Sequence, residues 1–438
     1  ETSEMTTTYD PHNPRYLDEE DLREELGRVY DLCHGCRLCF NLCPSFPTLF
    51  GAIDGHDGDV SAMTRAEQDK VVDECYQCKL CYVKCPYVPP HEWELDFPRL
   101  MMRANAVART KPGRPLAERA ADQFLGRTDL LGSVSSAIAP IVNAVTSAVG
   151  SLPRRVMEKA VGIHAERVLP PYARERFSTW FARRKAPGVE SPRAEVTVFP
   201  TCFVEYMEPA IAKDLVGVYE RNDIACSLPE GTRCCGAPWL HEGDVARFER
   251  VARRNVAALA AEVRAGRDVV VAQPTCAYVI RKDYPIYAPG VDADLVAAHT
   301  FDASEYLVNE HRRDGGGLST EFPGETFESV TYHLACHLRA QNVGFKGRDL
   351  IQLTGAKVTL VERCSGIDGT WGYRAENYEL ARKVAKPLAR EVSAAGADAV
   401  CGDCHLANTA ILQETGLRAV HPLQVLARAY GIESEPGR

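Results

Sequence analysis

The sequence lacks the motifs that mark several large classes of protein. It contains no GxxxxGK[ST] phosphate-binding loop and no flavin or nicotinamide fingerprint, so we do not expect it to bind the usual two-electron cofactors itself. No long basic run is present, and the net charge of −9 with a pI of about 5.8 argues against nucleic acid as a partner. The first 30 residues are acidic and lack the apolar stretch of a secretory signal peptide, which predicts a cytoplasmic protein.

Cysteine, in contrast, is abundant, with 17 residues in a chain of 438. Two runs near the N-terminus share the spacing Cys-x2-Cys-x2-Cys-x3-Cys-Pro, which is typical of bacterial ferredoxins that bind [4Fe–4S] clusters. Three thiolates spaced in this way can hold one face of a cube, whereas the fourth lies farther along the chain and crosses to the other cluster. The runs comprise Cys33, Cys36, Cys39 and Cys43, and then Cys75, Cys78, Cys81 and Cys85.

This spacing predicts two cubane [4Fe–4S] clusters in a helical, two-cluster ferredoxin-like domain at residues 1–110. One cluster is assigned Cys33, Cys36, Cys39 and Cys85, and the other Cys75, Cys78, Cys81 and Cys43. The alternatives are a pair of zinc sites, which favour two separated Cys pairs, or a disulfide framework. Cluster-binding thiolates need a reducing compartment, which again indicates the cytoplasm. Phe40 and Tyr76 are interpreted as packing residues that keep water off the sulfurs.

Residues 111–193 contain no Cys and are expected to form a helical connector. Within them, residues 131–152 carry no charge over 22 residues, a length that could cross a bilayer. Their Ser, Gly, Pro and Asn content lowers the mean hydropathy, so we favour an amphipathic helix that packs on protein. The alternative is a membrane-surface helix, which would hold the protein peripherally on the cytoplasmic face of a membrane and suit contact with quinone.

From residue 194 onward the pattern changes to that of an α/β protein. Short β-branched runs alternate with helical stretches, which predicts parallel sheets; the runs lie at 196–199, 269–272, 329–335, 357–362 and 397–400. This half is an internal repeat of residues 194–320 (copy one) and 321–438 (copy two). The fold class is therefore α+β overall, with a helical ferredoxin-like domain followed by two repeated α/β domains.

The cysteines of this half repeat with the strands. Cys202 matches Cys336, the loop Cys234-Cys235-Gly236 matches Cys364-Ser365-Gly366, and Cys276 matches Cys401. Because parallel sheets hold ligands beyond the carboxyl ends of their strands, each copy is expected to gather its cysteines into one metal site. The two predicted sets are Cys202, Cys234, Cys235 and Cys276 in copy one, and Cys336, Cys364, Cys401 and Cys404 in copy two.

Several neighbouring residues are candidates for supporting roles. Glycines would let backbone N–H groups approach cluster sulfurs, and these are Gly236, Gly366, Gly369 and Gly372. Spare ligands in copy two are His333, His337 and His405, so copy two is favoured for an open, reactive iron site. His299 and His421 precede matching helices and are interpreted as structural. Cys226 is interpreted as a core thiol, with spare ligation of copy one as the alternative.

The doubled C-x(n)-C-C-G-x(n)-C-x-x-C pattern behind a twin-cubane module resembles the CCG-domain iron–sulfur proteins over roughly residues 30–430. That family includes the B-subunit of heterodisulfide reductase, the glycolate oxidase iron–sulfur subunit and, with the most similar layout, the C-subunit of anaerobic glycerol-3-phosphate dehydrogenase. The resemblance implies an electron-transfer subunit that works beside a flavoprotein dehydrogenase and passes electrons to a quinone or another acceptor. It also implies one or two further iron–sulfur clusters in the CCG domains.

Both copies depart from the five-Cys pattern of the family. In copy one Val279 stands where the last Cys is expected, and in copy two Ser365 replaces the second Cys of the CCG loop. Each copy thus keeps four of the five thiolates. A second interpretation is a heterodisulfide-reductase-like catalytic subunit that reduces a disulfide or sulfur substrate at the cluster of copy two, and the missing fifth Cys counts against it.

Overall fold

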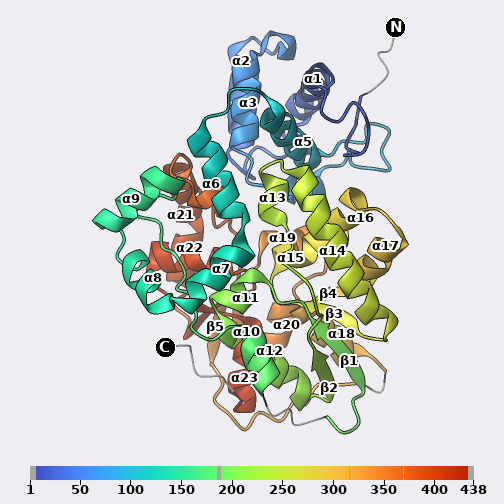
Figure 1. Ribbon diagram of the computed structural model, residues 1–438, viewed down its shortest axis with the longest axis vertical. Helices are drawn as coiled ribbons and strands as arrows, with labels where there is room; N and C mark the ends of the chain where they lie inside the picture. The colour runs from blue at the N-terminus through green and yellow to red at the C-terminus, as the bar shows by residue number, and fades with distance from the viewer. Residues whose placement is uncertain (1–5, 185–188, 315, 368, 433–438) are drawn as a thin grey trace.

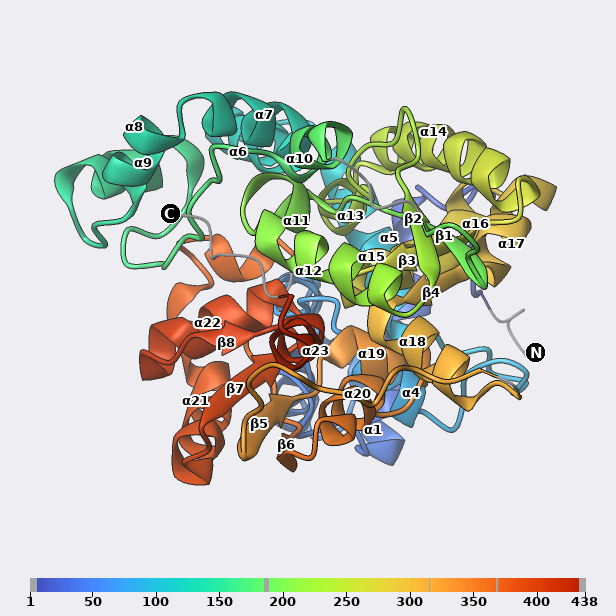
Figure 2. The ribbon, with the colours of Figure 1, turned by 90° about the horizontal axis from the view of Figure 1, so that it is seen from below.

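The computed structural model describes residues 6–184, 189–314, 316–367 and 369–432. A helical N-terminal unit lies at one end of the long axis, the two α/β copies fill the other end, and the connector helices run along one flank (Figure 1). Viewed from below, the two copies lie side by side with α23 between them (Figure 2). The prediction of helices combined with parallel α/β repeats is therefore confirmed.

Helices surround the first eight cysteines. Helix α1 starts where the Asp18 side chain accepts a hydrogen bond from the Asp21 N–H, and α3 starts at a capping box of Thr64 and Glu67. The apolar faces of these helices form one core, which includes Leu26, Phe46 and Leu100. The elements are α1 (Glu19–Cys36), α2 (Ser45–Gly55), η1 (Val60–Ala62), α3 (Arg65–Asp73), α4 (Leu80–Lys84) and α5 (Phe97–Thr110).

The connector consists of short helices rather than one long one. It contains α6 (Leu116–Gly126), α7 (Thr128–Ala137), α8 (Ala139–Thr146), α9 (Leu152–Val161) and α10 (Phe177–Arg183). The prediction of a single helix over residues 131–152 is wrong, because α7 and α8 meet at 105°. Pro140 is the second residue of α8 and cannot donate a hydrogen bond to the preceding turn. No single described helix is long and apolar enough to cross a membrane, and α7 and α8 pass that test of length and composition only as a bent pair.

Each copy contains a four-stranded parallel sheet with the same strand order. The order is β2-β1-β3-β4 in copy one and β6-β5-β7-β8 in copy two, which confirms the internal repeat. Three short edge strands, β2, β4 and β8, were not predicted. The strands are β1 (Ala194–Val198), β2 (Ile224–Ser227), β3 (Asp268–Val271), β4 (Thr300–Asp302), β5 (Ser329–His333), β6 (Lys357–Val361), β7 (Ala399–Gly402) and β8 (Ala419–Val420).

Helices cover both sheets and join the copies. In copy one they are α11 (Cys202–Tyr206), α12 (Pro209–Arg221), α13 (Ala237–His241), α14 (Val245–Arg264), α15 (Pro274–Tyr278), the π-helical turn η2 (Val279–Asp283), α16 (Tyr284–Tyr287), α17 (Val291–Ala298) and α18 (Ala303–Arg312). In copy two they are α19 (Cys336–Gln341), α20 (Lys346–Leu353), η3 (Trp371–Tyr373), α21 (Tyr378–Ala395), α22 (His405–Thr415) and α23 (Pro422–Tyr430). Leu215 of α12 and Leu426 of α23 lie in one shared core, which fixes the two copies to each other.

Candidate metal centres

Four N-terminal thiols line one small cavity of about 20 Å3, and they are Cys33, Cys36, Cys39 and Cys85 (group 1). Helix α1 supplies the first two, and Arg37 then turns the chain with a left-handed φ of 52°, which allows Cys39 to follow. Cys85 arrives from the end of α4. Burial, and then the nearby thiols, raise the pKa of Cys33 well above its usual value. The structure thus brings the fourth Cys of the second run to the first three of the first run.

The other four N-terminal thiols lie together in the same crossed manner, and they are Cys43, Cys75, Cys78 and Cys81 (group 2). Lys79, with a φ of 63°, occupies the position in the second run that Arg37 occupies in the first. Burial, and then neighbouring cysteines, raise the pKa values of Cys78 and Cys81. Phe40, expected to shield sulfur, is 47% exposed and stacks on Phe50 instead.

In copy one, all four predicted cysteines lie in contact. Hydrogen bonds between the thiol groups connect Cys202 to Cys234, Cys234 to Cys235, and Cys235 to Cys276. The backbone N–H of Gly236 also donates to Cys234, and these bonds lower the pKa of Cys234 although burial opposes them. Gly236 has a φ of +89°, and a Cβ atom there would lie 2.9 Å from the Phe248 ring, so this position requires glycine.

Connector residues close over the site of copy one. The Asp129 carboxylate of α7 accepts a hydrogen bond from the Cys234 N–H at 3.0 Å. Burial, and then the nearby Cys234, raise the pKa of Asp129 to about 6. An apolar cavity of about 210 Å3 adjoins the four thiols, and connector residues including Leu125, Leu131 and Ile163 line its other side. No sequence signal linked the connector to these cysteines, because the contact depends on tertiary packing alone.

In copy two, three of the four predicted cysteines line a cavity of about 20 Å3, and they are Cys336, Cys364 and Cys404. Hydrogen bonds from Cys336, from Tyr76 (Oη to Sγ, 3.1 Å) and from the Gly366 N–H (3.3 Å) lower the pKa of Cys364 to about 7, although burial opposes them. The Gly366 backbone therefore does approach sulfur, as predicted for the glycines. Gly369 and Gly372 have other neighbours, since a Cβ atom built on them would lie 3.2 Å from His241 and 2.9 Å from Ile367, respectively.

Cys401 lies apart from these three thiols. In the sheets, Val198 pairs with Val270 and Tyr332 pairs with Cys401, so Cys401 corresponds to the core residue Val270. It is fully buried on β7, in the core of copy two. The same register equates the helix-capping residues Gln273 and Cys404, and Cys276 then corresponds to Ala407. The sequence-based alignment of Cys276 with Cys401, and of Val279 with the missing Cys, is therefore replaced by this structural one.

The candidate histidines are buried and neutral. Burial lowers the pKa of His333 to about 4 and those of His337 and His405 to about 3. His333 and His337 line the cavity with the three thiols and Ser365. His405 instead contacts the Gln273 side chain, at 2.7 Å from Nδ1 to Oε1.

Three other candidates have structural surroundings. His421 caps α23 by accepting from the Leu423 N–H, whereas the matching helix α18 is capped by Asp302. His299 therefore does not match His421, and it pairs with Asp268 at 2.8 Å. Cys226 lies on β2, where its thiol faces Ile224 O at 3.9 Å.

Group 2 adjoins the site of copy two. Tyr76 and Cys78 line the same small cavity as Cys336 and Cys364. The Tyr76 ring packs on Trp371, with ring centres 5.1 Å apart, and the Trp371 indole N–H donates to Asp73 O at 2.7 Å. Tyr76 is thus a bridge between two sites as well as a packing residue, a role that its sequence position did not reveal.

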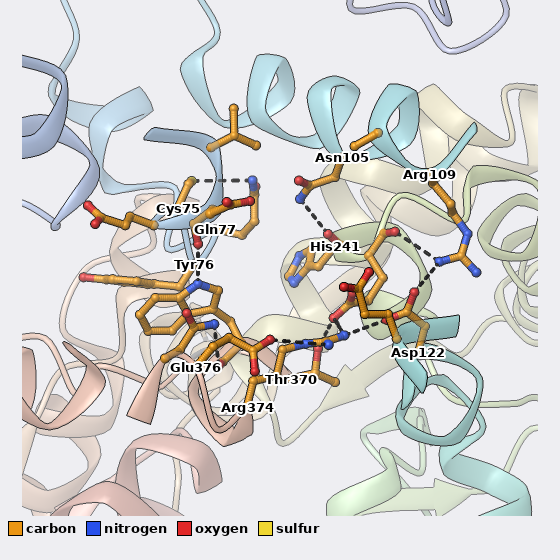
Figure 3. A pocket seen from close by; sticks show the side chains of 18 of the residues that line it. Cys75, Tyr76, Gln77, Asn105, Arg109, Asp122, His241, Thr370, Arg374 and Glu376 are labelled. Carbon is orange, nitrogen blue, oxygen red and sulfur yellow. Dashed lines mark hydrogen bonds and ion pairs between the residues drawn. The ribbon is translucent and has the colours of Figure 1, made fainter. Parts of the chain in front are cut away.

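A cavity of about 580 Å3 reaches Cys75 where the N-terminal unit, α6 and both copies meet (Figure 3). Asp122, which is 1% exposed, receives hydrogen bonds from Arg109, Arg114 and Arg374 at 2.8–3.0 Å. Arg374 also contacts Glu242, and Arg109 contacts Asp244. These ion pairs join the N-terminal unit, the connector and both copies around the cavity.

The donor sets fit iron–sulfur clusters better than the alternatives. Among the residues that the structure describes, no three His, Cys, Asp or Glu side chains surround a point that one metal ion could occupy. A zinc ion needs ligands within about 2.3 Å, whereas sets of thiols around a cavity suit a multi-atom group. All 17 cysteines are free, which counts against the disulfide framework.

Comparison with known proteins gives matches over both halves of the chain. Residues 25–86 match the 4Fe-4S dicluster domain, and residues 196–281 and 330–407 match the cysteine-rich domain. The C-subunit of anaerobic glycerol-3-phosphate dehydrogenase from Escherichia coli is 32% identical over 308 residues, or 70% of this chain and 76% of that protein. The B-subunit of fumarate reductase (CoM/CoB) from Methanothermobacter marburgensis is 28% identical over 246 residues, or 54% and 46% of the two chains. Lactate utilization protein A of Shouchella clausii is 25% identical over 220 residues, or 48% and 87%.

These matches cover the residues that carry the chemistry. The dicluster match spans both N-terminal cysteine runs, and each cysteine-rich match spans the thiols of one copy. Together they indicate that the chain holds iron–sulfur clusters. The chain belongs to the family of cysteine-rich-domain iron–sulfur proteins that includes the C-subunit of anaerobic glycerol-3-phosphate dehydrogenase.

Proposed function

We propose that this chain is an electron-transfer subunit that accepts electrons from a flavoprotein dehydrogenase and delivers them to a quinone. Group 1 and group 2 would each hold one cubane [4Fe–4S] cluster, in a domain of residues 1–110. A connector at residues 111–193 and CCG domains at 194–320 and 321–438 complete the chain. Iron–sulfur clusters supply one-electron transfer when bound, and the protein would position them and set their potentials through burial and hydrogen bonds.

Each copy has residues that suit a further cluster. Copy one offers Cys202, Cys234, Cys235 and Cys276, four thiols that already contact one another. Copy two offers Cys336, Cys364 and Cys404, with Ser365, His333 and His337 beside them as candidates for a fourth ligand. The burial of Cys401 on β7 argues against its use as a ligand.

The observation that carries the proposal is the contact between group 2 and copy two. The Tyr76 hydroxyl lies 3.1 Å from Cys364 Sγ, and Cys78 lines the same cavity as Cys336. Redox centres held by residues in contact can exchange electrons without exposure to solvent. The contact therefore favours a relay over two unrelated metal domains.

A second contact continues the route between the copies. The Gln273 side-chain amide donates to Cys404 Sγ at 3.4 Å, and Gln273 lies three residues before Cys276 of copy one. The neighbouring Thr275 hydroxyl contacts His337 at 3.1 Å. These bonds connect the thiols of copy two to those of copy one through buried polar groups.

The connector supports a membrane-surface location for the acceptor side. Apolar residues are exposed along α7, α8 and the start of α9, and these are Leu130, Val134, Ile138, Ile141, Val145, Val149, Leu152 and Val156. An exposed apolar surface of this kind is typical of a protein or membrane contact. We infer that it holds the subunit on the cytoplasmic face of a membrane, next to a pool of quinone.

Reduction of a disulfide at copy two is the second candidate. A lowered pKa of Cys364 would suit thiol–disulfide chemistry. However, the cavity there measures about 20 Å3, far below the roughly 300 Å3 at which ligand pockets usually begin. The space next to the thiols thus favours electron relay.

The test uses full-length protein purified anaerobically with its iron. Dithionite-reduced protein is mixed with menadione, and the return of the oxidised visible spectrum is followed. We expect rapid reoxidation of the wild type, and reoxidation at least tenfold slower in Cys364→Ala, which retains the iron of groups 1 and 2. Cys226→Ala, a cysteine outside every site, should behave as wild type. Colourless protein, or a Cys364→Ala variant that reoxidises at the wild-type rate, would contradict the proposal.

A further inference from the structure

The apolar cavity beside copy one has features of a ligand site that the relay itself does not need. Its volume is about 210 Å3. Phe124, Leu125 and Leu131 of the connector form one side, and Phe203, Tyr206 and Met207 of copy one form another. Its surface is therefore mostly apolar or aromatic, and the four thiols proposed to hold the cluster of copy one form part of the lining.

The position of the cavity connects those thiols to the apolar surface of the connector. Helix α7 presents Leu131 to the cavity, whereas its neighbours Leu130 and Val134 are each 54% exposed on the outer side. One helix thus separates the cavity from the exposed apolar face. A ligand that reaches this cavity from that face must itself be lipophilic.

We propose that the cavity binds the ring of a lipophilic quinone, which receives electrons at copy one. This inference rests on the proposed relay function and adds the place of its acceptor. A flat aromatic ring suits walls formed by Phe203, Tyr206 and Tyr373. The volume lies below the roughly 300–1,000 Å3 of pockets for drug-sized ligands, so the cavity takes the ring only and the hydrocarbon tail lies outside it.

The electrons and protons that reduce the quinone at this site come from outside the cavity. The quinone takes up two electrons, one at a time, together with two protons from water, and becomes a quinol. The electrons come from the substrate that the flavoprotein partner oxidises. The protein supplies the electron route through Gln273 and Cys276 and excludes water from the ring by the apolar walls.

Two tryptophan variants on α6 test the site. Leu125 lines the cavity, whereas Leu116 on the same helix is 79% exposed and distant from the lining. Binding of 2-heptyl-4-hydroxyquinoline N-oxide, a fluorescent quinol analogue, is measured by quenching on iron-loaded, full-length protein. We expect one binding site in the wild type and in Leu116→Trp, and affinity at least tenfold lower in Leu125→Trp. Leu131→Trp blocks the cavity from α7 and serves as the second variant if Leu125→Trp loses its iron.

The outcomes separate this inference from the proposed function. If both cavity variants bind the analogue as tightly as the wild type, the ring binds elsewhere and the inference is overturned. The inference is also overturned if the wild type binds no analogue although its reduced form is reoxidised by menadione. In that case the proposed relay function stands. If the wild type neither binds the analogue nor is reoxidised by menadione, the relay to quinone falls together with the site.

Discussion

Replacing Tyr76 by Phe should lower the reduction potential of the cluster proposed at copy two. Tyr76 is 3% exposed, and its hydroxyl lies 3.1 Å from Cys364 Sγ. Phenylalanine keeps the ring and its packing on Trp371, so the substitution removes only the hydrogen bond. A donor to a ligating sulfur stabilises the more negative, reduced state more than the oxidised state, and its loss makes reduction harder.

The size of the shift follows from the strength of that bond. Hydrogen bonds to charged groups contribute about 1.5–3 kcal/mol, and only the difference between the two oxidation states affects the potential. If about half of the smaller value differs, the change is about 0.8 kcal/mol. For a one-electron couple, 59 mV corresponds to about 1.4 kcal/mol, so we expect a shift of about 30 mV to lower potential.

The assay is an anaerobic redox titration followed by EPR, on samples of equal iron content. Tyr87→Phe is the matched control, because the Tyr87 phenol hydrogen-bonds to Cys36 of group 1. That variant should move the signal of group 1 and leave copy two unchanged. If Tyr76→Phe leaves every midpoint potential at the wild-type value, or moves only the signal of group 1, the proposed link between Tyr76 and copy two is refuted.

Three further predictions concern ligands, stability and backbone. Cys404→Ala should lose the iron of copy two. Cys401→Val should keep that iron, because valine is the residue at the matching strand position of copy one, Val270. Equal iron loss in the two variants would contradict the register of the two sheets. Asp122→Asn should reduce the free energy of unfolding in urea by about 3 kcal/mol, since three arginines lose a buried carboxylate. Arg109 keeps Asp244 and Arg374 keeps Glu242, whereas Arg114 keeps only the exposed Glu118 at 3.9 Å. Glu118→Gln should have little effect, because that pair is exposed. Burial opposes ionisation of Asp122, but Arg114 and Arg374 lower the pKa of its carboxyl overall. The carboxylate therefore contributes fully to stability above its pKa in the unfolded chain, about 3.9, and this contribution is lost as pH falls through the folded pKa. The difference in unfolding free energy between the wild type and Asp122→Asn should accordingly narrow below about pH 4. Gly366→Ala should fold poorly, because its φ is +67° and the added Cβ would lie 2.2 Å from Ala381 O; a normal melting temperature would count against this strain.

The N-terminal cysteines illustrate what spacing can predict. In each run, three ligands fall within seven residues, so local chain geometry alone decides which thiols share a face. The proline after each fourth Cys and the left-handed residues Arg37 and Lys79 repeat in both runs. The structure groups the eight thiols in the crossed way that this spacing predicts: local geometry places three thiols of each group, and only the fourth comes from the other run.

The site of copy two shows where the same reasoning fails. The predicted strand at 397–400 ended just before Cys401, but β7 runs to Gly402. Two additional strand residues move Cys401 from a loop into the sheet, and its side chain then belongs to the core. A CxxC spacing looks the same in a sequence whether it spans a turn or the end of a strand, so only the pairing of β5 with β7 resolves it.

The connector shows a failure of a different kind. Pro140 in the middle of residues 131–152 already argued against one continuous helix, since proline cannot donate to the preceding turn. No local pattern predicted that Asp129 contacts the Cys234 N–H or that Leu131 lines the cavity of copy one. These pairs are about 100 residues apart and depend on how α7 packs against copy one.

The two copies differ in their surroundings, and this difference orders the route. Copy two is enclosed against group 2 by Tyr76 and Trp371, with about 20 Å3 of free space. Copy one also reaches that small cavity through Thr275, but its own four thiols adjoin a cavity of about 210 Å3 beside the apolar connector. An enclosed centre suits transfer within the protein, and a centre beside open apolar space suits transfer to a diffusible acceptor. The sequence favoured copy two as the reactive site because it carries nearby histidines, but each of these uses one ring nitrogen to contact Arg363 O, Thr275 or Gln273, which fixes it in place beside the cluster site. The available space therefore makes copy one the end of the relay. Gln273 is the final connection, because it contacts Cys404 of copy two and lies in the same chain segment as Cys276 of copy one.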